Sequence, residues 1–414
     1  MDIPDIPNDK FLENLIAQLE RAVRAGNRNE ALELRAQIFK YLAEQSRQID
    51  NIELKVDDII GGLDVLPPNR GVIAQMEEVD HVDFPVWFAT NRKELALQGE
   101  SIGIGFGGER NQTSSKGRAT VTIPLADRPI SITPNDWPRR RNPKKDLRVL
   151  TPLTKFTTDE DFFADMWKEK REEALIFIHG FNNTFEESVK RAAQVGYDLG
   201  INGPTALFSW PSRGRLDDYM VDEATIEASE RHIEEFISAV VATTQQPGFS
   251  QTPYPVHVIA HSMGNRGFLR ALQRISANVE RRKTFKLGQI ILAAADVDAD
   301  LFKDLSFVYP EFAARTTAYI SPNDHAVCAS AVLHEAPRMG YFDPYTSAKG
   351  IDTVAVKAYR LEHLGLFHSY FGESLAVLND MSAVMHGVTP ARSKFYRESA
   401  TTQPIWQLQV APDE

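Results

Sequence analysis

The chain has 414 residues, of which 43% are hydrophobic and 25% charged, the composition of an ordinary globular protein. A chain of this length buries a large apolar core without disulfides, and its single cysteine, Cys328, excludes an intramolecular disulfide and a zinc site built from cysteines. The net charge of −11, from 46 basic and 57 acidic residues, argues against a nucleic acid partner, because no basic surplus would meet the phosphates.

The amino-terminal region is expected to be helical. Apolar residues recur at helical spacing from Phe11 to Val23, from Ala31 to Leu42 and from Ile49 to Ile59, which predicts a helical hairpin or three-helix segment over residues 1–65. Such a segment would be a cap, a partner-binding hairpin or the contact of a homo-oligomer. No apolar run has the roughly 20 residues of a membrane span, and no basic stretch precedes an apolar one as in a signal peptide. We therefore expect a cytoplasmic protein.

Residues 80–390 are expected to form the main domain, followed by a C-terminal tail over 391–414. Strand-like runs at 84–90 and 116–124 come first. The glycine-rich stretch between them, GIGFGGER, lacks the Gly-Lys-Ser/Thr ending of a phosphate-binding loop and is interpreted as a plain loop. The basic run at 134–148 is interpreted as a solvated loop.

From residue 172 onward, buried apolar runs alternate with helical patterns, which predicts an α/β fold with a mostly parallel central sheet covered by helices on both faces. Functional sites in such sheets lie beyond the carboxyl ends of the strands. The expected helices span 185–199, 222–243 and 265–278, and the expected strands span 174–178, 205–210, 256–260, 287–295, 315–320 and 354–361.

Residues 256–271 read VHVIAHSMGNRGFLRA, an apolar strand that runs through a serine directly into a helix. Ala260 and Gly264 stand two positions before and after Ser262, and small residues there let the chain turn sharply and raise the hydroxyl above the sheet. The pattern predicts a nucleophile elbow with Ser262 as the nucleophile. The alternative is a serine that only caps the helix.

A nucleophilic serine needs a base, and the base needs an acid that orients it. Behind such an elbow the order along the chain is serine, acid, histidine. Asp324 follows the second strand after the elbow strand and is the predicted acid. Asp296 and Asp298 follow the strand before it and are the alternatives, although they also suit a role in capping or bracing the loop at Asp300.

The loop after the strand at 354–361, the last one predicted, contains two histidines. His368 precedes a helix in LGLFHSYF and is the predicted base, whereas His363 is interpreted as a packed or surface residue. His325 is adjacent to Asp324 in the sequence, but neighbouring side chains rarely form the required pair.

The oxyanion of the reaction needs two N–H donors. The N–H of Met263 is one candidate. The other is the N–H of Phe181, in the loop after the strand at 174–178, where Gly180 allows a close backbone approach. The candidates for lining the substrate pocket are Gly180, Asn182, Trp210 and His261, although a core position suits Trp210 equally well, the ring of His261 should point away from the hydroxyl, and Asn183 or Thr184 should cap the next helix.

No metal or cofactor site is predicted. His334-Glu335 lacks the second histidine of an H-E-x-x-H zinc motif. Asp296, Asp298 and Asp300 alternate as at the start of a calcium loop, but the glycine and the closing glutamate of that loop are missing.

Many separate motifs, in order along the chain, together resemble one family. They are PVWFATNR (85–92), KGRATVTIP (116–124), FIHGFNN (177–183), FSWPSRG (208–214), HVIAHSMGNRGFLRAL (257–272), ILAAADVDADLF (291–302), YISPNDHA (319–326) and HSYF (368–371). The set resembles the α/β-hydrolase family long catalogued as of unknown function, the DUF900 group, whose members are regarded as serine esterases or lipases.

The resemblance covers residues 84–385 and implies an α/β-hydrolase fold with a triad at Ser262, Asp324 and His368. The chain departs from the family at Phe367, where the family usually has glycine. The resemblance leaves the role of the amino-terminal helices open.

The sequence therefore predicts a serine-dependent carboxylic-ester hydrolase that acts on a small-molecule ester through an acyl-enzyme. One alternative is that the same triad cleaves a thioester or an amide or transfers the acyl group to an acceptor other than water. The other is a binding or scaffolding protein on a hydrolase fold, without catalysis.

Overall fold

The computed structural model describes residues 18, 81–95, 105–125, 147–168, 172–245, 254–322, 324–341, 345–358, 370–388, 392–395 and 405–410. The helical segment predicted over 1–65, apart from Gln18, and most of the basic run, residues 134–146, lie outside the described residues. The chain divides into two units, Met1–Asp80 with Val332–Glu335, and His81–Ala331 with Ala336–Glu414, and the second unit contains the sheet. Within the described ranges no helix is long and apolar enough to cross a membrane.

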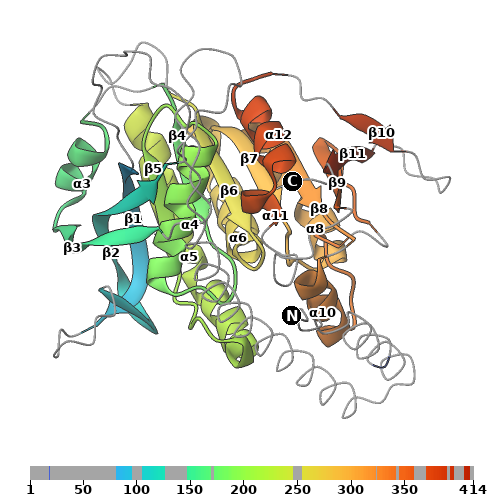
Figure 1. Cartoon of the computed structure of the whole chain (residues 1–414), viewed down its shortest axis with the longest axis horizontal. Helices are drawn as coiled ribbons and strands as arrows, with labels where there is room; N and C mark the ends of the chain where they lie inside the picture. Colours follow the sequence, from blue (N-terminus) through green and yellow to red (C-terminus); the bar gives the residue numbers. More distant parts are fainter. Residues whose placement is uncertain are drawn as a thin grey trace, which may run out of the picture. The chain divides into compact units, whose positions relative to one another are not determined.

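The second unit is built on one sheet of eleven strands in the order β10-β11-β9-β8-β7-β6-β4-β5-β1-β2-β3 (Figure 1). Neighbouring strands are parallel from β11 to β1, and the pairs at the two edges are antiparallel. The strands are β1 (His81–Glu94), β2 (Phe106–Pro124), β3 (Arg148–Phe156), β4 (Ala174–Ile178), β5 (Thr205–Ser209), β6 (Val256–His261), β7 (Leu287–Ala293), β8 (Ala313–Ile320), β9 (Ile351–Ala358), β10 (Ser393–Phe395) and β11 (Ile405–Val410).

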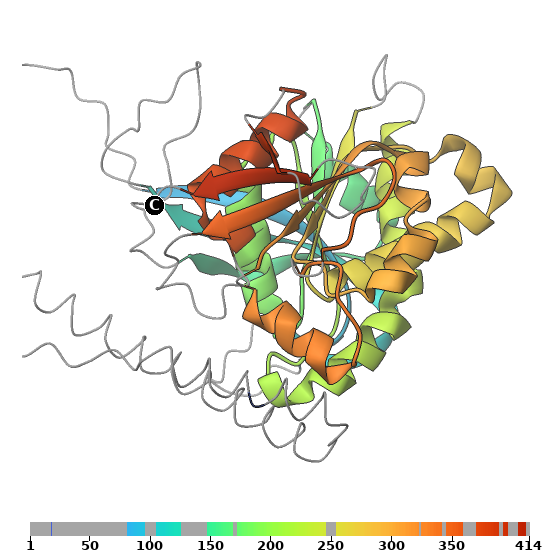
Figure 2. The same cartoon turned by 90° about the vertical axis from the view of Figure 1, so that its right-hand side faces the viewer.

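Helices cover both faces of this sheet, as Figures 1 and 2 show. They are α3 (Asp159–Met166), α4 (Phe185–Asp198), α5 (Tyr219–Thr244) preceded by the short η1 (Leu216–Asp218), α6 (Gly264–Ala277), α7 (Val279–Thr284), α8 (Ala299–Leu305), α9 (Val308–Phe312), α10 (His325–Leu333), α11 (Tyr370–Glu373) and α12 (Leu375–Met385).

Strand β4 shows how the two faces are used. Its five residues, ALIFI, are all buried. The ring of Phe177 lies 6.3 Å from that of Phe371 in α11, whereas the side chain of Ile178 lies at the first residue of α6, Gly264. Consecutive side chains on a strand point to opposite faces. Helices α6 and α11 therefore cover opposite faces, which explains the continuous apolar runs of the central strands.

The predicted fold class, a mostly parallel sheet flanked by helices, is confirmed. The structure adds elements at both edges of the sheet. Strand β2 begins at Phe106, inside the stretch interpreted as a glycine-rich loop, and strand β3 follows it in space. The segment expected as a tail contributes β10 and β11, so the strand predicted as the last one, β9, is followed by two more.

Candidate active site

Ser262 stands at the turn between β6 and α6. Its φ is 52°, in the left-handed region that residues other than glycine rarely adopt. Backbone hydrogen bonds hold the turn on both sides. The Ser262 N–H donates to the carbonyl of Ala293 at 2.9 Å, and the Ser262 carbonyl accepts from the N–H groups of Asn265 at 3.0 Å and Asp296 at 3.2 Å. The strained conformation is thus fixed by β7 and by the first turn of α6.

Two glycines allow the elbow to pack against the end of β4. A Cβ atom at Gly264 would lie 2.4 Å from the carbonyl oxygen of His179, which is backbone and does not yield easily. A Cβ atom at Gly180 would lie 2.6 Å from the Cβ of Ser262. The loop that follows β4 therefore touches the serine directly, at the carboxyl ends of two adjacent strands.

Hydrogen bonds of the Asn183 side chain fix the backbone of the loop at 180–183. Asn183 Nδ2 donates to the carbonyls of Phe181 at 2.7 Å and Gly180 at 3.3 Å. Because the N–H and C=O of a trans peptide point in opposite directions, this bond to Gly180 turns the following N–H, that of Phe181, away from the Asn183 side chain. Thr184 and Glu187 form a capping box at the start of α4, so the predicted capping of this helix falls on Thr184.

His179 and Trp210 pack against each other at the start of this loop. Their rings are stacked with centroids 5.0 Å apart, and Trp210 Nε1 donates to the His179 carbonyl at 2.7 Å. Burial and then the charge of Arg92 lower the pKa of His179 to about 3, so its imidazole is neutral. Trp210 is fully buried, which favours the core position over the pocket for this residue. The ring of His261 contacts that of Phe371, with centroids 4.4 Å apart.

Asp324, the predicted acid, follows β8 and is completely buried. Its Oδ1 accepts from the N–H of Val327 at 3.0 Å in the first turn of α10. Burial and then the charge of Asp324 raise the pKa of the Tyr370 phenol at the start of α11. The Tyr370 hydroxyl donates to the Tyr319 carbonyl at 2.9 Å.

The two alternative acids are occupied in other ways. Asp298 is the N-cap of α8 and accepts from the N–H groups of Asp300 and Leu301 at 3.0 and 2.9 Å. Asp296 lies in a buried polar network. Its carboxylate accepts from the hydroxyls of Tyr219 and Ser330, both at 2.5 Å, and lies 3.4 Å from Arg266 Nη2 and 3.5 Å from Arg338 Nε.

Two arginines, Arg266 and Arg338, offset the negative charge of Asp296 in this network. Burial opposes the ionisation of Asp296, but the two arginines and the two hydroxyls together hold its pKa below the usual value. Sequence reasoning considered Asp296 but not Tyr219, Arg266 or Arg338, because their pairing depends on long-range packing. Tyr219 also contacts the loop after β4, since its ring meets that of Phe181 edge-on at 5.1 Å.

The predicted base, His368, lies outside the described residues, as do His363 and Phe367. The residues that follow His368 are described from Tyr370 onward. Phe371 contacts His261, the neighbour of Ser262, and the Gly372 carbonyl accepts from Gln194 Nε2 of α4 at 2.5 Å. Helix α11 thus contacts the carboxyl ends of β6 and β8, next to the turn at Ser262.

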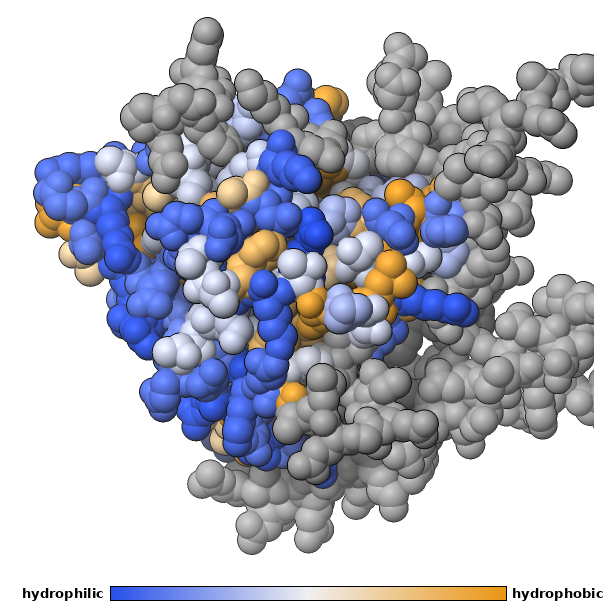
Figure 3. Space-filling view, turned by 90° about the vertical axis from the view of Figure 1, so that its left-hand side faces the viewer, coloured by the Kyte–Doolittle hydropathy of each residue, from blue (hydrophilic) through white to orange (hydrophobic). Residues whose placement is uncertain are grey.

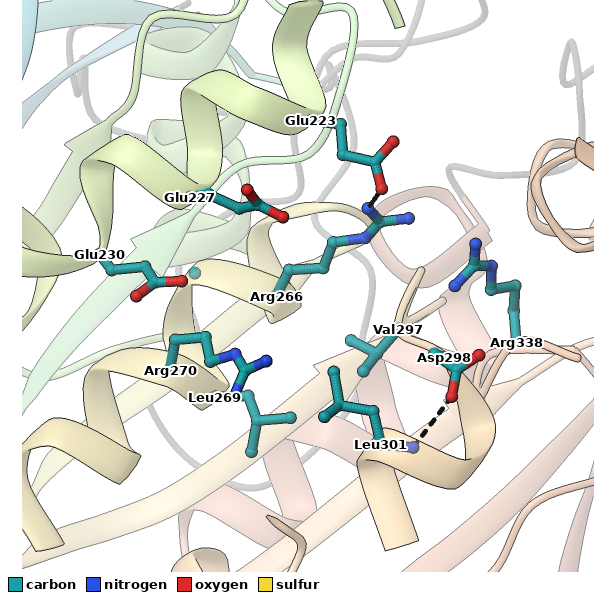
Figure 4. Close-up of a pocket in the computed structure, with 11 residues that line it drawn as sticks. Glu223, Glu227, Glu230, Arg266, Leu269, Arg270, Val297, Asp298, Leu301 and Arg338 are labelled. Carbon is teal, nitrogen blue, oxygen red and sulfur yellow. Dashed lines mark hydrogen bonds and ion pairs between the residues drawn. The ribbon is translucent and has the colours of Figure 1, made fainter. Parts of the chain in front are cut away.

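A polar pocket of about 170 Å³ lies between α5, α6 and the loop before α8 (Figure 4). Its wall has mixed charge, with Arg266 paired to Glu223 and Arg338 on the other side. Arg266 stands one helical turn after Ser262, but neither Ser262 nor Asp324 lines the pocket. In the part of the chain that the structure describes, no cluster of His, Cys, Asp and Glu side chains is arranged to hold a metal ion.

Three comparisons with known proteins were made. A solved structure, the PEG-bound complex of a novel cold-adapted esterase from an Arctic intertidal metagenomic library, is similar over 70% of this chain and 100% of that chain, at 12% identity and a TM-score of 0.30. No curated protein matches. The model of the family described as "Alpha/beta hydrolase of unknown function (DUF900)" matches residues 154–385, more than half of the chain. The chain therefore belongs to this family of alpha/beta hydrolases.

Proposed function

We propose that this protein is a serine-dependent carboxylic-ester hydrolase with Ser262 as nucleophile. The observation that carries the proposal is the backbone of Ser262, held at a φ of 52° between β6 and α6 with the loop after β4 packed against it. A strained serine at this point of an α/β-hydrolase sheet exposes its hydroxyl to a substrate and to the N–H groups around it. A helix-capping serine needs no such conformation.

The proposed acid and base are Asp324 and His368. Both follow Ser262 in the chain order serine, acid, histidine that this fold uses, and Asp324 is buried after the end of β8. Phe371, three residues after His368 in the sequence, contacts the ring of His261, the neighbour of Ser262.

The proposed reaction has two steps. His368 takes the proton of the Ser262 hydroxyl as Oγ attacks the ester carbonyl, and the oxyanion accepts hydrogen bonds from the N–H groups of Met263 and Phe181. The alcohol leaves with the proton from His368, which gives the acyl-enzyme. A water molecule that His368 deprotonates then releases the acid and restores the serine. Asp324 fixes the imidazole orientation and stabilises its charged form.

A small ester is the proposed substrate class. The net charge of −11 disfavours an anionic lipid surface as the substrate. Figure 3 shows the edge of the sheet that carries β3 and α3, away from the turn at Ser262, where hydrophilic residues predominate and apolar ones form separate small spots. The alternatives are cleavage of a thioester or an amide, or acyl transfer to an acceptor other than water, through the same acyl-enzyme.

The test is hydrolysis of p-nitrophenyl esters from acetate to palmitate by the wild type, by Ser262→Ala and by Ser276→Ala. We expect Ser262→Ala to lower kcat by at least about 10⁴-fold, because it removes the nucleophile. Ser276 lies on the same helix and bonds Glu311, so its variant should retain wild-type turnover. Turnover by Ser262→Ala near the wild-type level would refute the mechanism. A folded wild type that neither turns over these esters nor reacts with a fluorophosphonate at Ser262 would point to a binding protein.

A further inference from the structure

Arg92, near the end of β1, is a buried guanidinium whose partners come from the start of β2, the loop after β4, and the end of β5 with the loop that follows it. Its side chain is 1% exposed. Nη1 donates to the carbonyls of Ser212 at 2.7 Å and Gly107 at 3.1 Å, Nη2 donates to the carbonyl of Asn183 at 2.8 Å, and Nε donates to the Ser209 hydroxyl at 2.9 Å. Burial lowers the pKa of Arg92 to about 9, although the charges of Asp222 and Glu187 act in the opposite direction.

The hydrogen-bond partners of the Arg92 guanidinium are carbonyl groups, a hydroxyl and, at 3.5 Å, the ring nitrogen of His179, not a carboxylate. Asp222, the carboxylate that acts most on its charge, is occupied by the Ser212 hydroxyl at 2.6 Å and the Arg213 N–H at 3.1 Å. Burying a charge without a directly paired counter-charge is costly. The benefit of burying Arg92 is a fixed arrangement of the surrounding backbone, because the planar guanidinium binds several acceptors at once.

Asn183 connects Arg92 to the loop beside the elbow. Its carbonyl accepts from Arg92, and its N–H donates to the Ser212 hydroxyl at 3.1 Å, so its backbone is tied on both sides. Its side chain in turn binds the carbonyls of Gly180 and Phe181. Gly180 is pressed against the Cβ of Ser262. A continuous set of contacts thus runs from the guanidinium to the loop that carries the Phe181 N–H.

We propose that Arg92 is a positioning residue, which sets the place of the Phe181 N–H relative to the Ser262 hydroxyl by holding Asn183. The proposal rests on the proposed function, since the N–H matters only if an oxyanion forms there. An oxyanion donor acts in the transition state rather than in substrate binding. Loss of Arg92 should therefore lower kcat and leave KM nearly unchanged.

The test compares Arg92→Lys with a matched control, Arg392→Lys. Lysine keeps the charge but supplies one point donor instead of a fork. Arg392 is equally buried and bidentate, to Asp380 near the opposite edge of the sheet, so its variant reports the effect of disturbing a buried arginine elsewhere. Each variant is assayed with p-nitrophenyl acetate below its own unfolding transition, and amide exchange is measured by mass spectrometry over residues 179–184.

We expect Arg92→Lys to lose about 10²-fold in kcat with little change in KM, to bind a trifluoromethyl ketone that mimics the oxyanion correspondingly more weakly, and to exchange faster over 179–184. Arg392→Lys should keep the wild-type kcat. If Arg92→Lys does not fold, Asn183→Ala, which keeps the backbone groups and removes the bonds to Gly180 and Phe181, should show the same loss in kcat.

Three results would overturn the role of Arg92. A wild-type kcat in the folded variants would do so, as would an equal loss in Arg392→Lys, which would show a general effect of stability. A wild type that neither hydrolyses esters nor reacts with a fluorophosphonate would instead refute the proposed function, and with it the role that depends on it.

Discussion

At the scale of single residues, the turn at Ser262 shows how neighbouring groups hold an unfavourable backbone conformation in place. The φ of Ser262 belongs to a region that costs free energy for any residue with a Cβ. The bonds from Ala293, Asn265 and Asp296 and the close approach of Gly180 maintain it. Because Asp296 supports the Ser262 carbonyl through its own N–H, a side-chain change at Asp296 need not disturb the elbow.

The identity of the acid is the first prediction at this scale. We expect Asp324→Asn to lower kcat on the order of 10⁴-fold with little loss of stability, because the base would lose its orienting carboxylate. Asp296→Asn should leave Arg266 and Arg338 without their shared carboxylate and cost about 3–5 kcal/mol in the free energy of unfolding. Urea unfolding and kcat, measured on both variants, separate the two roles. A larger loss of kcat in Asp296→Asn would assign the acid to Asp296.

Sequence reasoning at this scale found residues that carry a local pattern. Ser262 stands between a strand and a helix, and Gly180 and Phe181 follow a strand directly. Arg92 and Tyr219 carry no such pattern, because their partners at Asn183 and Asp296 are far away in the sequence. A buried arginine can be identified only when the strands are placed side by side.

At the scale of elements, Glu173 joins the start of β4 to β6 and to the end of α12. Its Oε2 lies 3.2 Å from His257 Nε2, and its Oε1 lies 3.6 Å from His386 Nε2. His257 Nδ1 accepts from the Gln289 N–H at 2.9 Å, which leaves the proton on Nε2 for Glu173. Burial opposes ionisation of Glu173, but the two histidines and the Asn202 N–H, which donates to Oε1 at 2.7 Å, together lower its pKa to about 2.

This cluster predicts how stability depends on pH. The contribution of Glu173 is complete above its unfolded pKa of about 4.3 and is lost as the pH falls toward 2. Glu173 in turn raises the pKa of His386, whose contribution is complete below about pH 6.5 and is lost as the pH rises through the raised value. Both contributions are therefore complete only between about pH 4.3 and 6.5.

Glu173→Gln should reduce the free energy of unfolding most in this window, and its stability curve should be flatter than that of the wild type on either side. Urea unfolding at a series of pH values measures this, with Glu280→Gln, from an exposed pair on α7, as the control. If the free energies of unfolding of wild type and Glu173→Gln differ by the same amount at every pH, the ion pairs of Glu173 do not cause the loss of stability.

At the scale of the whole molecule, Arg392 fastens the last part of the chain to the sheet. Its guanidinium binds Asp380 of α12 in a bidentate pair, with Nη2 to Oδ2 at 2.6 Å and Nε to Oδ1 at 2.8 Å, and the Tyr319 hydroxyl donates to the same carboxylate at 2.5 Å. Both charged side chains are at most 3% exposed. Breaking such a pair leaves a buried charge without compensation.

We therefore expect Arg392→Ala to lower the free energy of unfolding by about 3–5 kcal/mol. Arg215→Ala removes an exposed pair with Asp217 and should cost at most about 1 kcal/mol. Thermal or urea unfolding of both variants provides the comparison. Equal small losses would mean that the residues after α12 are not anchored by this pair.

The sequence predicted the middle of the sheet better than its edges, for a physical reason. Strands β4, β5 and β6 are buried at every position and read as mostly apolar runs, each followed by a helix. At the edges, β3 reads RVLTPLTKF and is mostly exposed. Strand β11 has only six residues, and no regular hydrophobic pattern leads up to it in the sequence. Such strands are specified by their neighbours rather than by their own composition, so their pairing could not be predicted.

The pairing of β11 with β9 has a consequence for the chain as it is synthesised. Residues 405–410 align with 353–358, and until they exist the edge of β9 presents unpaired backbone groups beside buried apolar strands. Such an edge pairs readily with another copy and promotes aggregation. The elbow is complete soon after residue 262, but the sheet can close its growing edge only after residue 405 has been made. During synthesis, the turn at Ser262 is therefore complete long before the edge of β9 is covered. In that interval the edge can pair with nascent chains on neighbouring ribosomes of the same messenger RNA.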